Sequence, residues 1–393
     1  MFFIGIDVAK RKHSLAAITK TGEKVIEGYE FANSTAGFEH MLLRLTTAGI
    51  THENSRVALE ATGHYSRSIT AHLIDKGFEI ALGNPLQTHN FAKAQSIRKV
   101  KNDAVDALAL AQWLLVGSPV SARLSSSETS ELKSIARFRT FQSQIIGDCK
   151  RKAIAVLDQL FPEYASFFSD IFGTTSLAVL MRYPSAKALS RAHIDSLTGL
   201  IEKSSRGKLG GELAHALRAS AKSSFATNAA IAAQTLELKQ LLSQIEFARK
   251  QLAEIDREMK VLLDKAQTLI TTIPGIGVVC GATILGEIGD IARFKKPSSL
   301  VAFAGLDPSV YESGEFKGTN NHLSKRGSTY LRWALWIAAD RARVFDPAFK
   351  GYYLKKRGEG KCHKVAVSAL ARKLCNTIFA VLTNNVEYVC RAS

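Results

Sequence analysis

Two carboxylates stand three residues apart in the stretch 101–108, which reads KNDAVDAL. Good helix formers continue the stretch to Leu115, and positions three apart on a helix are neighbours on one face. This spacing predicts that Asp103 and Asp106 lie side by side, where like charges raise a pKa unless a cation intervenes. A divalent metal ion is the natural cation for such a pair. The alternative is that both acids only stabilise a solvated helix start, where the macrodipole favours negative charge.

Two further acids lie at the ends of predicted strands. Asp7 comes near the end of the apolar run 2–8, and Glu60 closes the run 55–60. Functional groups of α/β proteins gather at strand ends, and ligand sets made only of oxygen favour Mg2+ or Mn2+. The sequence therefore predicts that Asp7 and Glu60 join the aspartate pair around one or two divalent ions, which can act on a phosphodiester. For Asp7 alone, a turn residue at a strand end is the alternative.

The elements expected around these acids follow a known order. Apolar runs and alternating patterns predict strands at 2–8, 13–19, 24–31, 55–60 and 78–83, and helices at 35–47, at 66–76 and around the aspartate pair. Three strands, then helix, strand, helix, strand and helix is the order of ribonuclease-H-like domains, an α/β sheet with helices on its faces. In that order the first and fourth strands are adjacent, which brings Asp7 beside Glu60.

The charge of the chain indicates a polyanionic partner. The 393 residues carry a net charge of +17, which argues for nucleic acid. Residues 1–120 hold 13 Lys and Arg against 11 Asp and Glu, whereas residues 291–393 hold 18 against 7. The basic excess therefore lies in the last quarter of the chain, away from the predicted acidic site.

Length and composition indicate two or three domains with ample hydrophobic cores. Hydrophobic residues make up 46% of the chain, and the five cysteines are scattered without the close spacing of a zinc site. A reducing compartment fits this cysteine usage. We expect no signal peptide, no apolar run of membrane-spanning length and no membrane partner, and hence a cytoplasmic protein.

Beyond residue 120 the pattern becomes helical. The pattern of residues 125–160 predicts a helix, whereas the pattern of residues 161–232 indicates little about secondary structure or function. In residues 235–266 apolar side chains repeat every seven residues from Leu238 to Met259. This heptad repeat predicts a coiled coil, formed within the chain or between subunits. One long helix packed on its own domain is the alternative.

A glycine-containing turn follows that helix. Residues 268–292 place the turn Pro274–Gly277 between two apolar segments, which is typical of a helix-hairpin-helix. Backbone N–H groups at Gly275 and Gly277 would then contact a DNA phosphate. An ordinary helical hairpin turn that uses glycine is the alternative.

A serine-containing loop lies further along, before a helix predicted to begin near Thr329. Lys325 and Arg326 precede that helix and suit a phosphate. Serines in such loops are by default turn or capping residues. Spacing alone does not distinguish Ser313 from the other serines of residues 309–328 as a nucleophile.

Six motifs along the chain resemble those of the DEDD transposases of the IS-one-ten group of insertion sequences, whose relatives include the Piv-type DNA invertases. They are GIDVAK (5–10), ALEATGHY (58–65), KNDAVDA (101–107), IPGIG (273–277), FAGLDPSVYESG (303–314) and SKRG..YLR (324–332). The resemblance covers both ends of the chain, and residues 150–235 match poorly.

The resemblance implies three parts. They are a RuvC-like catalytic domain over residues 1–120, a helical linker and coiled coil over 121–267, and a mainly helical C-terminal transposase domain over 268–393. The expected fold class is thus α/β followed by all-α, with the helix-hairpin-helix-like motif in the last part.

The resemblance also implies roles for particular residues. The family's metal-binding set falls on Asp7, Glu60, Asp103 and Asp106, which would hold Mg2+, and its catalytic serine falls on Ser313. Members of the family excise and insert DNA, and several are guided by a bridge RNA. They act as tetramers, in which the serine of one subunit completes the acidic site of another. The expected partners are therefore DNA of the element ends and target, a bridge RNA, and further copies of the chain as a dimer to tetramer.

The favoured hypothesis is a Mg2+-dependent transposase that cleaves and rejoins DNA through a serine. A serine hydroxyl is a weak nucleophile that needs activation, and metal held by carboxylates could supply it while neutralising charge on the phosphate. A RuvC-like junction nuclease that uses water and a DNA invertase are the alternatives. A non-catalytic protein that binds nucleic acid is a further one.

Overall fold

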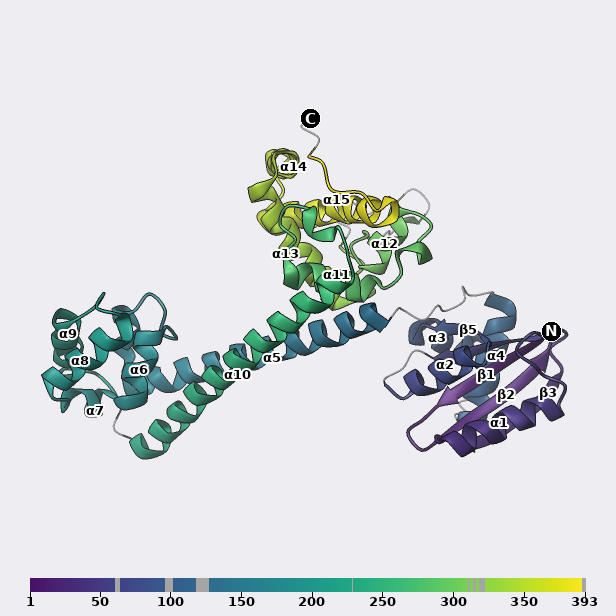
Figure 1. The fold of residues 1–393 in the computed structure, drawn as a ribbon, viewed down its shortest axis with the longest axis horizontal. Helices are drawn as coiled ribbons and strands as arrows, with labels where there is room; N and C mark the ends of the chain where they lie inside the picture. The colour runs from purple at the N-terminus through teal and green to yellow at the C-terminus, as the bar shows by residue number, and fades with distance from the viewer. Residues whose placement is uncertain are drawn as a thin grey trace. The chain divides into compact units, whose positions relative to one another are not determined.

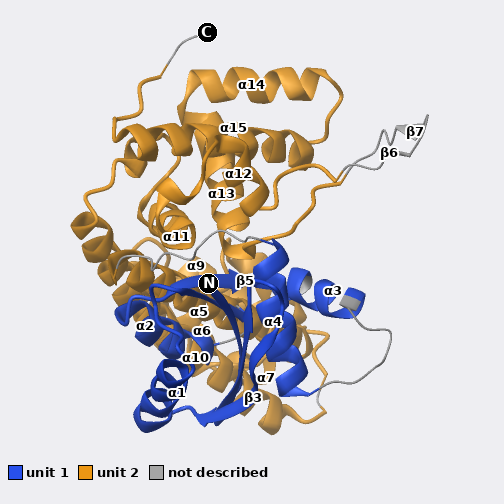
Figure 2. Cartoon of the chain, turned by 90° about the vertical axis from the view of Figure 1, so that its right-hand side faces the viewer, with its two compact units in different colours: residues 1–125 blue, residues 126–393 orange. Residues whose placement is uncertain are grey.

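The computed structural model describes residues 1–60, 64–95, 102–117, 127–227, 229–309, 312–313, 316–317 and 322–390. The chain divides into two compact units, residues 1–125 and residues 126–393, which are coloured separately in Figure 2. Figure 1 labels the helices and strands of each unit.

Unit 1 is built on a five-stranded mixed sheet. Its strands are β1 (Phe2–Val8), β2 (Lys12–Thr19), β3 (Lys24–Ala32), β4 (Ser55–Glu60) and β5 (Glu79–Gly83). Their spatial order is β3-β2-β1-β4-β5. The first three strands pair antiparallel, whereas β4 pairs parallel with both β1 and β5. The predicted adjacency of the first and fourth strands is confirmed.

Helices cover both faces of this sheet (Figure 2). The helices are α1 (Thr35–Thr47), α2 (Ser66–Asp75), α3 (Pro85–Gln95) and α4 (Asp103–Gly117). Side chains alternate along β1, so that Ile4 and Ile6 pack under α1 and α2, whereas Phe3 packs under α4. The sheet therefore separates two apolar cores, and only one of them contains α4.

Two long helices organise unit 2 (Figure 1). α5 (Ser127–Leu160) and α10 (Ile231–Lys265) pack along one another. Leu238, Ile245 and Met259 of the heptad repeat are all buried. α10 is thus one continuous helix with a partner in its own chain. A coiled coil between subunits stays a prediction.

The chain between α5 and α10, about which the sequence indicated little, forms a small helical subdomain. Its elements are the 3-10 turn η1 (Pro162–Phe167) and the helices α6 (Thr174–Arg182), α7 (Ala186–Ser190), α8 (Ile194–Ser205) and α9 (Gly211–Lys222). They share a core with the adjoining ends of the two long helices. Gln159 of α5 and Gln234 of α10 are joined at that end by a 2.7 Å hydrogen bond.

The C-terminal part of unit 2 is mainly helical. It contains the 3-10 turns η2 (Ile270–Thr272) and η3 (Ile291–Arg293), the helices α11 (Val278–Ile288), α12 (Pro297–Phe303), α13 (Thr329–Phe345), α14 (Pro347–Gly358) and α15 (His363–Asn384), and the two-residue strands β6 (Glu312–Ser313) and β7 (Phe316–Lys317). Only the 3-10 turn η2 immediately precedes the turn Pro274–Gly277, and the helix-hairpin-helix stays a prediction.

One described helix is long and apolar enough to cross a membrane. It is α15, although we expected no apolar run of that length. Half of the most apolar 18-residue segment of this helix is buried inside the protein, and Leu370 and Leu374 lie in the C-terminal core. A helix that is buried in a protein core can be as long and as apolar as one that crosses a membrane.

Candidate active site

The register of two parallel strands brings Asp7 and Glu60 to one edge of the sheet. β1 and β4 are paired up to Ile6 and Leu59, and each acid is the next residue on its strand. Ile6 and Leu59 both belong to the core under α1 and α2. Because side chains alternate along a strand, both acids project toward the other face, on which α4 lies.

α4 approaches this face closely because β1 has a glycine beneath it. A Cβ on Gly5 would lie 2.0 Å from the carbonyl oxygen of Ala107 and 2.5 Å from the backbone nitrogen of Ala111. Helix and strand therefore meet backbone to backbone at this point. Asp103 lies one helical turn before Ala107, and Asp7 lies two residues after Gly5. The contact thus sets the first turn of α4 near Asp7.

The first turn of α4 carries the aspartate pair that the sequence singled out. Its start is stabilised by Asn102, whose side-chain oxygen accepts a 2.8 Å hydrogen bond from the backbone N–H of Val105. Neither Asp103 nor Asp106 supplies this cap. Both carboxylates lie in the first turn, where the helix dipole favours negative charge.

The charges of all four acids meet at Asp7. Burial, followed by the charges of Asp106, Asp103 and Glu60, raises the pKa of Asp7 to about 6. A hydrogen bond from the backbone of Val8 opposes this rise. Three like charges therefore act on one half-buried carboxyl group, and a bound cation would relieve their repulsion.

The donor set suits a hard divalent cation. All four side chains are carboxylates, whose oxygens are the ligands that Mg2+ prefers. Among the residues that the structure describes, no three His, Cys, Asp or Glu side chains are close enough to hold one ion. Mg2+ commonly keeps several waters and takes only one or two carboxylates, so this arrangement fits the ion without a closed cage. Residues 61–63 and 96–101, on either side of these acids, lie outside the described residues.

The predicted nucleophile lies in unit 2. Ser313 belongs to β6 and pairs through its backbone with Phe316 of β7. Its side chain lies outside the described parts of the chain, as do residues 310–311 and 314–315. The position of Ser313 is therefore known at the level of the backbone.

Hydrogen bonds fasten the chain on both sides of this hairpin. The backbone N–H and the hydroxyl of Ser309 donate to the carbonyl oxygen of His322, at 2.8 and 2.9 Å. The hydroxyl of Ser324 donates to Asp307 at 2.5 Å. Both hydroxyl groups are thus engaged with structural acceptors, which spacing in the sequence could not indicate.

The predicted phosphate contacts Lys325 and Arg326 are exposed in the loop before α13. The backbone of this loop is held tightly, because Lys325 donates to the carbonyl oxygen of Gly305 at 3.2 Å. Gly327 has a φ of 113°, and a Cβ there would lie 2.0 Å from the carbonyl oxygen of Phe303. Both cationic side chains are thus in solvent on a fixed backbone, and the phosphate contact stays a prediction.

An ion pair between a buried carboxylate and a partly exposed arginine supports the start of α13. Glu287 of α11 accepts hydrogen bonds from Arg137 Nε at 2.6 Å and from the hydroxyl of Ser328 at 2.9 Å. The same hydroxyl accepts a 3.2 Å bond from the backbone N–H of Leu331 and so caps α13. Glu287 therefore fixes the end of the loop that carries Lys325.

The two glycines of the predicted phosphate-binding turn differ in their surroundings. Gly275 has a φ of 91°, and a Cβ there would lie 2.5 Å from the backbone nitrogen of Ala342. This glycine is therefore needed for packing against α13. Gly277 is exposed, and no described atom lies within 4 Å of its Cβ position. The geometry leaves room for a phosphate at Gly277, and the contact stays a prediction.

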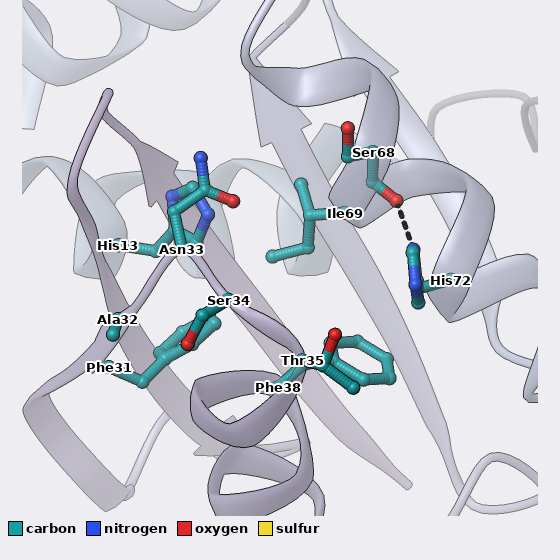
Figure 3. A pocket seen from close by; sticks show the side chains of 10 residues that line it. All are labelled: His13, Phe31, Ala32, Asn33, Ser34, Thr35, Phe38, Ser68, Ile69 and His72. Carbon is teal, nitrogen blue, oxygen red and sulfur yellow. Dashed lines mark hydrogen bonds between the residues drawn. The ribbon is translucent and has the colours of Figure 1, made fainter.

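A separate pocket of about 240 Å³ lies on the opposite face of the sheet (Figure 3). His13 of β2 and His72 of α2 line it together with Phe38 of α1. His13 pairs with Val8, whereas the neighbouring pair contains Asp7. Because neighbouring pairs face opposite sides of a sheet, this pocket is distinct from the acidic site.

Gly5, Asn102 and Glu287 each position part of the candidate site, although none of them was predicted to do so from the sequence. Gly5 interrupts an apolar run, which in a strand signals a close approach by another backbone. Asn102 directly precedes a helical pattern, which is the signal for a cap. Glu287 gave no comparable signal, because its partner Arg137 is 150 residues away in the chain.

Comparisons with known proteins match both parts of the chain that contain candidate residues. A family model of DEDD transposases of the IS110 group matches residues 4–162, and one described as transposase of the IS116/IS110/IS902 family matches residues 267–354. The chain belongs to the IS110/IS116 transposase family. The four acids of this IS110-family transposase lie in the first match, and Ser313 lies in the second.

Relatives of the transposase align over nearly its whole length. A protein of insertion element IS116 from Streptomyces clavuligerus is 26% identical over 97% of this chain and 94% of its own length. A protein of insertion element IS110 from Streptomyces coelicolor is 23% identical, over 99% and 96%. The pilin gene-inverting protein of Moraxella lacunata is 23% identical, over 98% and 96%. The transposase is thus an enzyme that cleaves and rejoins DNA.

Proposed function

We propose that this IS110-family transposase is a Mg2+-dependent serine recombinase. In this proposal Asp7, Glu60, Asp103 and Asp106 hold Mg2+ or Mn2+, and Ser313 is the nucleophile. The observation that carries the proposal is the placement of Asp7 and Glu60 at one edge of the sheet, against the face on which α4 presents Asp103 and Asp106. Burial, with the charges of the other three carboxylates, raises the pKa of Asp7. A bound divalent ion would neutralise charge on the scissile phosphate and activate the attacking oxygen.

The covalent step transfers the phosphoryl group of the cleaved strand to the serine and so conserves a phosphodiester bond. The hydroxyl oxygen of Ser313 attacks the phosphorus, its proton passes to water, and the bond from phosphorus to the leaving strand oxygen breaks. The leaving oxygen takes a proton from water. The phosphoserine link keeps the energy of the broken bond, and attack by a new strand end rejoins the DNA and restores the serine. Direct hydrolysis by water would lose that energy.

Two features of unit 2 support Ser313 as the nucleophile. The neighbouring Ser309, Ser324 and Ser328 donate their hydroxyl protons to acceptors within the fold. Ser313 lies in a short hairpin that precedes the loop of the exposed cations Lys325 and Arg326 in the sequence, and we propose that these cations contact the DNA backbone. Gly277 at the start of α11 is proposed as a further backbone contact.

Trapping of a covalent protein–DNA adduct tests the proposal. With labelled DNA that carries the element ends and with Mg2+, the wild-type transposase should form an adduct that resists denaturant. Ser313→Ala should form none, whereas the matched control Ser309→Ala should still form it. Cleaved DNA without any adduct in the wild type would favour the water-dependent nuclease instead. Loss of the adduct in Asp106→Asn, with DNA binding retained, would connect it to the acidic site.

The relative named for pilin gene inversion keeps a second DNA rearrangement open. Inversion and transposition require the same cleavage and rejoining, and they differ in the arrangement of the two sites. We propose transposition, because the relatives from Streptomyces are named for insertion elements. Element ends on both sides of the gene would support this assignment, and a flanking invertible segment would overturn it.

We further propose that the transposase works as a dimer to tetramer and is guided by a bridge RNA, as the family resemblance implies. RNA that copurifies with the protein, and loss of strand cleavage after treatment with ribonuclease, would support the guide. A monomer at the concentration where cleavage is complete would exclude the assembly.

A further inference from the structure

A groove in unit 2 belongs to neither the acidic site nor the serine hairpin. It lies between α5 and the start of α13 and has a volume of about 520 Å³. This volume is within the range of about 300–1,000 Å³ of pockets that hold small organic ligands. Its lining combines the aromatic side chains Tyr330 and Trp333 with the polar side chains of Gln144 and Arg151.

The aromatic side of the groove offers a ring to a ligand. Trp333 is 43% exposed, although a tryptophan side chain is usually well covered in a folded protein. Tyr330, one helical turn earlier, is held in place by Arg137, whose guanidinium carbon lies 4.9 Å from the centre of its ring. An exposed indole beside a fixed phenol ring is the arrangement on which unpaired bases stack.

Two arginines, Arg139 and Arg151, line the charged side of the groove, and they differ in how firmly their acidic partners hold them. Arg139 is half-buried and makes a 2.5 Å ion pair with Asp256 of α10, so its charge is already neutralised within the protein. Among the residues that the structure describes, Arg151 pairs with Asp148, one turn earlier on α5, and its side chain is 73% exposed. Exposed pairs of this kind contribute little stability. Arg151 can therefore leave Asp148 for a phosphate at little cost.

We propose that this groove binds one unpaired nucleotide of the DNA substrate. Its base stacks on Trp333, and its phosphate contacts Arg151. Only an unstacked base can present its face to an aromatic side chain, because the faces of paired bases are covered by their neighbours. An enzyme that exchanges DNA strands must separate them. A binding site for one unpaired base would prevent a separated strand from pairing again. The inference does not require Ser313 to be the nucleophile.

The loop of Lys325 and Arg326 leads directly into the groove. The helix α13 begins two residues after Gly327, and its first turns supply Tyr330 and Trp333. A strand whose backbone lies along the cationic loop would therefore bring its next base to the groove. DNA is the substrate that this family cleaves, so we infer that DNA occupies the groove.

Binding of short oligonucleotides to the full-length transposase tests the groove. Trp333→Ala should lose about tenfold in affinity for single-stranded DNA, as expected for one stacked base. Affinity for duplex DNA of the same sequence should change less than about twofold, since its bases stay paired. Trp333→Phe should keep most of the affinity. Phe247→Ala is the matched control, because Phe247 is an exposed aromatic residue of α10 outside the groove.

The charge contact has its own test. Arg151→Ala should reduce the slope of log affinity against log salt concentration by about 0.7 for single-stranded DNA, the value for one lost phosphate contact. Lys152→Ala is the control on the same helix, because Lys152 pairs with Glu237 and does not line the groove. Its slope should match that of the wild type.

Several outcomes would overturn the inference. They are unchanged single-strand binding by Trp333→Ala, an equal loss for duplex DNA, and a loss confined to RNA strands. Should Trp333→Ala fail to fold, photocrosslinking of wild-type protein to DNA that contains 5-iodouracil decides the question. A crosslinked peptide that contains Trp333 supports the groove, and crosslinks only elsewhere overturn it. Ser313→Ala should bind single-stranded DNA as the wild type does, which separates this test from that of the nucleophile.

Discussion

The hydroxyl of Ser328 donates a 2.9 Å hydrogen bond to Oε2 of Glu287 and ties the start of α13 to α11. Both oxygens of the same carboxylate accept bonds from Arg137 of α5, at 2.6 and 3.0 Å. Three helices therefore meet at one carboxylate that is only 3% exposed. Burial raises the pKa of Glu287, but the bonds and charge of Arg137 and the bond from Ser328 outweigh it and hold the pKa below its ordinary value.

Removal of this carboxylate's charge should destabilise unit 2. Breaking a fully buried ion pair costs about 3–5 kcal/mol, and Arg137 is partly solvated, so we expect Glu287→Gln to lose about 2 kcal/mol. Chemical denaturation of the full chain measures this change. Glu27→Gln is the control, because its pair with Lys24 is exposed on both sides and should contribute less than about 0.5 kcal/mol. Equal effects of the two substitutions would contradict the role of Glu287.

The contribution of Glu287 should depend on pH in a defined direction. Its folded pKa lies below the ordinary value of 4.5, so the stabilisation is complete above about pH 5 and is lost as the pH falls through the folded pKa. The difference in unfolding free energy between wild type and Glu287→Gln should be constant from about pH 7 to pH 5 and should shrink below that. A difference that grows in acid would show the opposite linkage and reject this ion pair as the cause.

A methyl group on Gly5 should displace α4 from the sheet. The added Cβ would lie 2.0 Å from the carbonyl oxygen of Ala107, which cannot move without the helix. We expect Gly5→Ala to cost about 1–3 kcal/mol, the usual range for overpacking. Gly199→Ala is the matched control, because no described atom lies within 4 Å of its Cβ position in α8. There the same change should stabilise the helix by up to about 1 kcal/mol. Comparable losses at both sites would remove the argument from close packing.

Mg2+ should stabilise the wild type through the acidic site. Because burial and three like charges raise the pKa of Asp7 to about 6, its ionised form strains the metal-free fold at pH 7.5. Asp7→Asn should therefore raise the stability of the metal-free protein, on the order of 1–2 kcal/mol after the shift is discounted for solvent screening of this half-buried group, and should abolish the increase in unfolding temperature that Mg2+ produces. Asp75→Asn, on the exposed end of α2, should leave that increase unchanged. An undiminished response to Mg2+ in Asp7→Asn would place the ion elsewhere.

The strand order around Asp7 and Glu60 could be predicted because local patterns specify it. Alternation and apolar runs located the strands and α1, and the chain order then required β1 to lie beside β4, as observed. The first turn of α4 was predictable for the same reason, since good helix formers follow Asn102. These features depend on neighbours in the sequence, and residue types and spacing record them directly.

Contacts between distant segments could not be predicted in this way. The bond between Arg137 and Glu287 joins residues 150 positions apart, and neither residue has a distinctive local pattern. The helical subdomain was missed because its helices are short, and α7 spans only Ala186–Ser190. Whether a loop serine is engaged or free, as for Ser309, also depends on a partner that only the fold supplies.

The 2.7 Å bond between Gln159 and Gln234 has a consequence for how this chain can vary among its relatives. The chain leaves α5 and enters α10 at the same place. We therefore expect the sequence of the 74 intervening residues to change without displacing either long helix. The two family models stop at residue 162 and resume at residue 267. The stretch between the two matches therefore contains nearly all of these residues together with α10, and we expect insertions within them to leave the pairing of the two long helices intact.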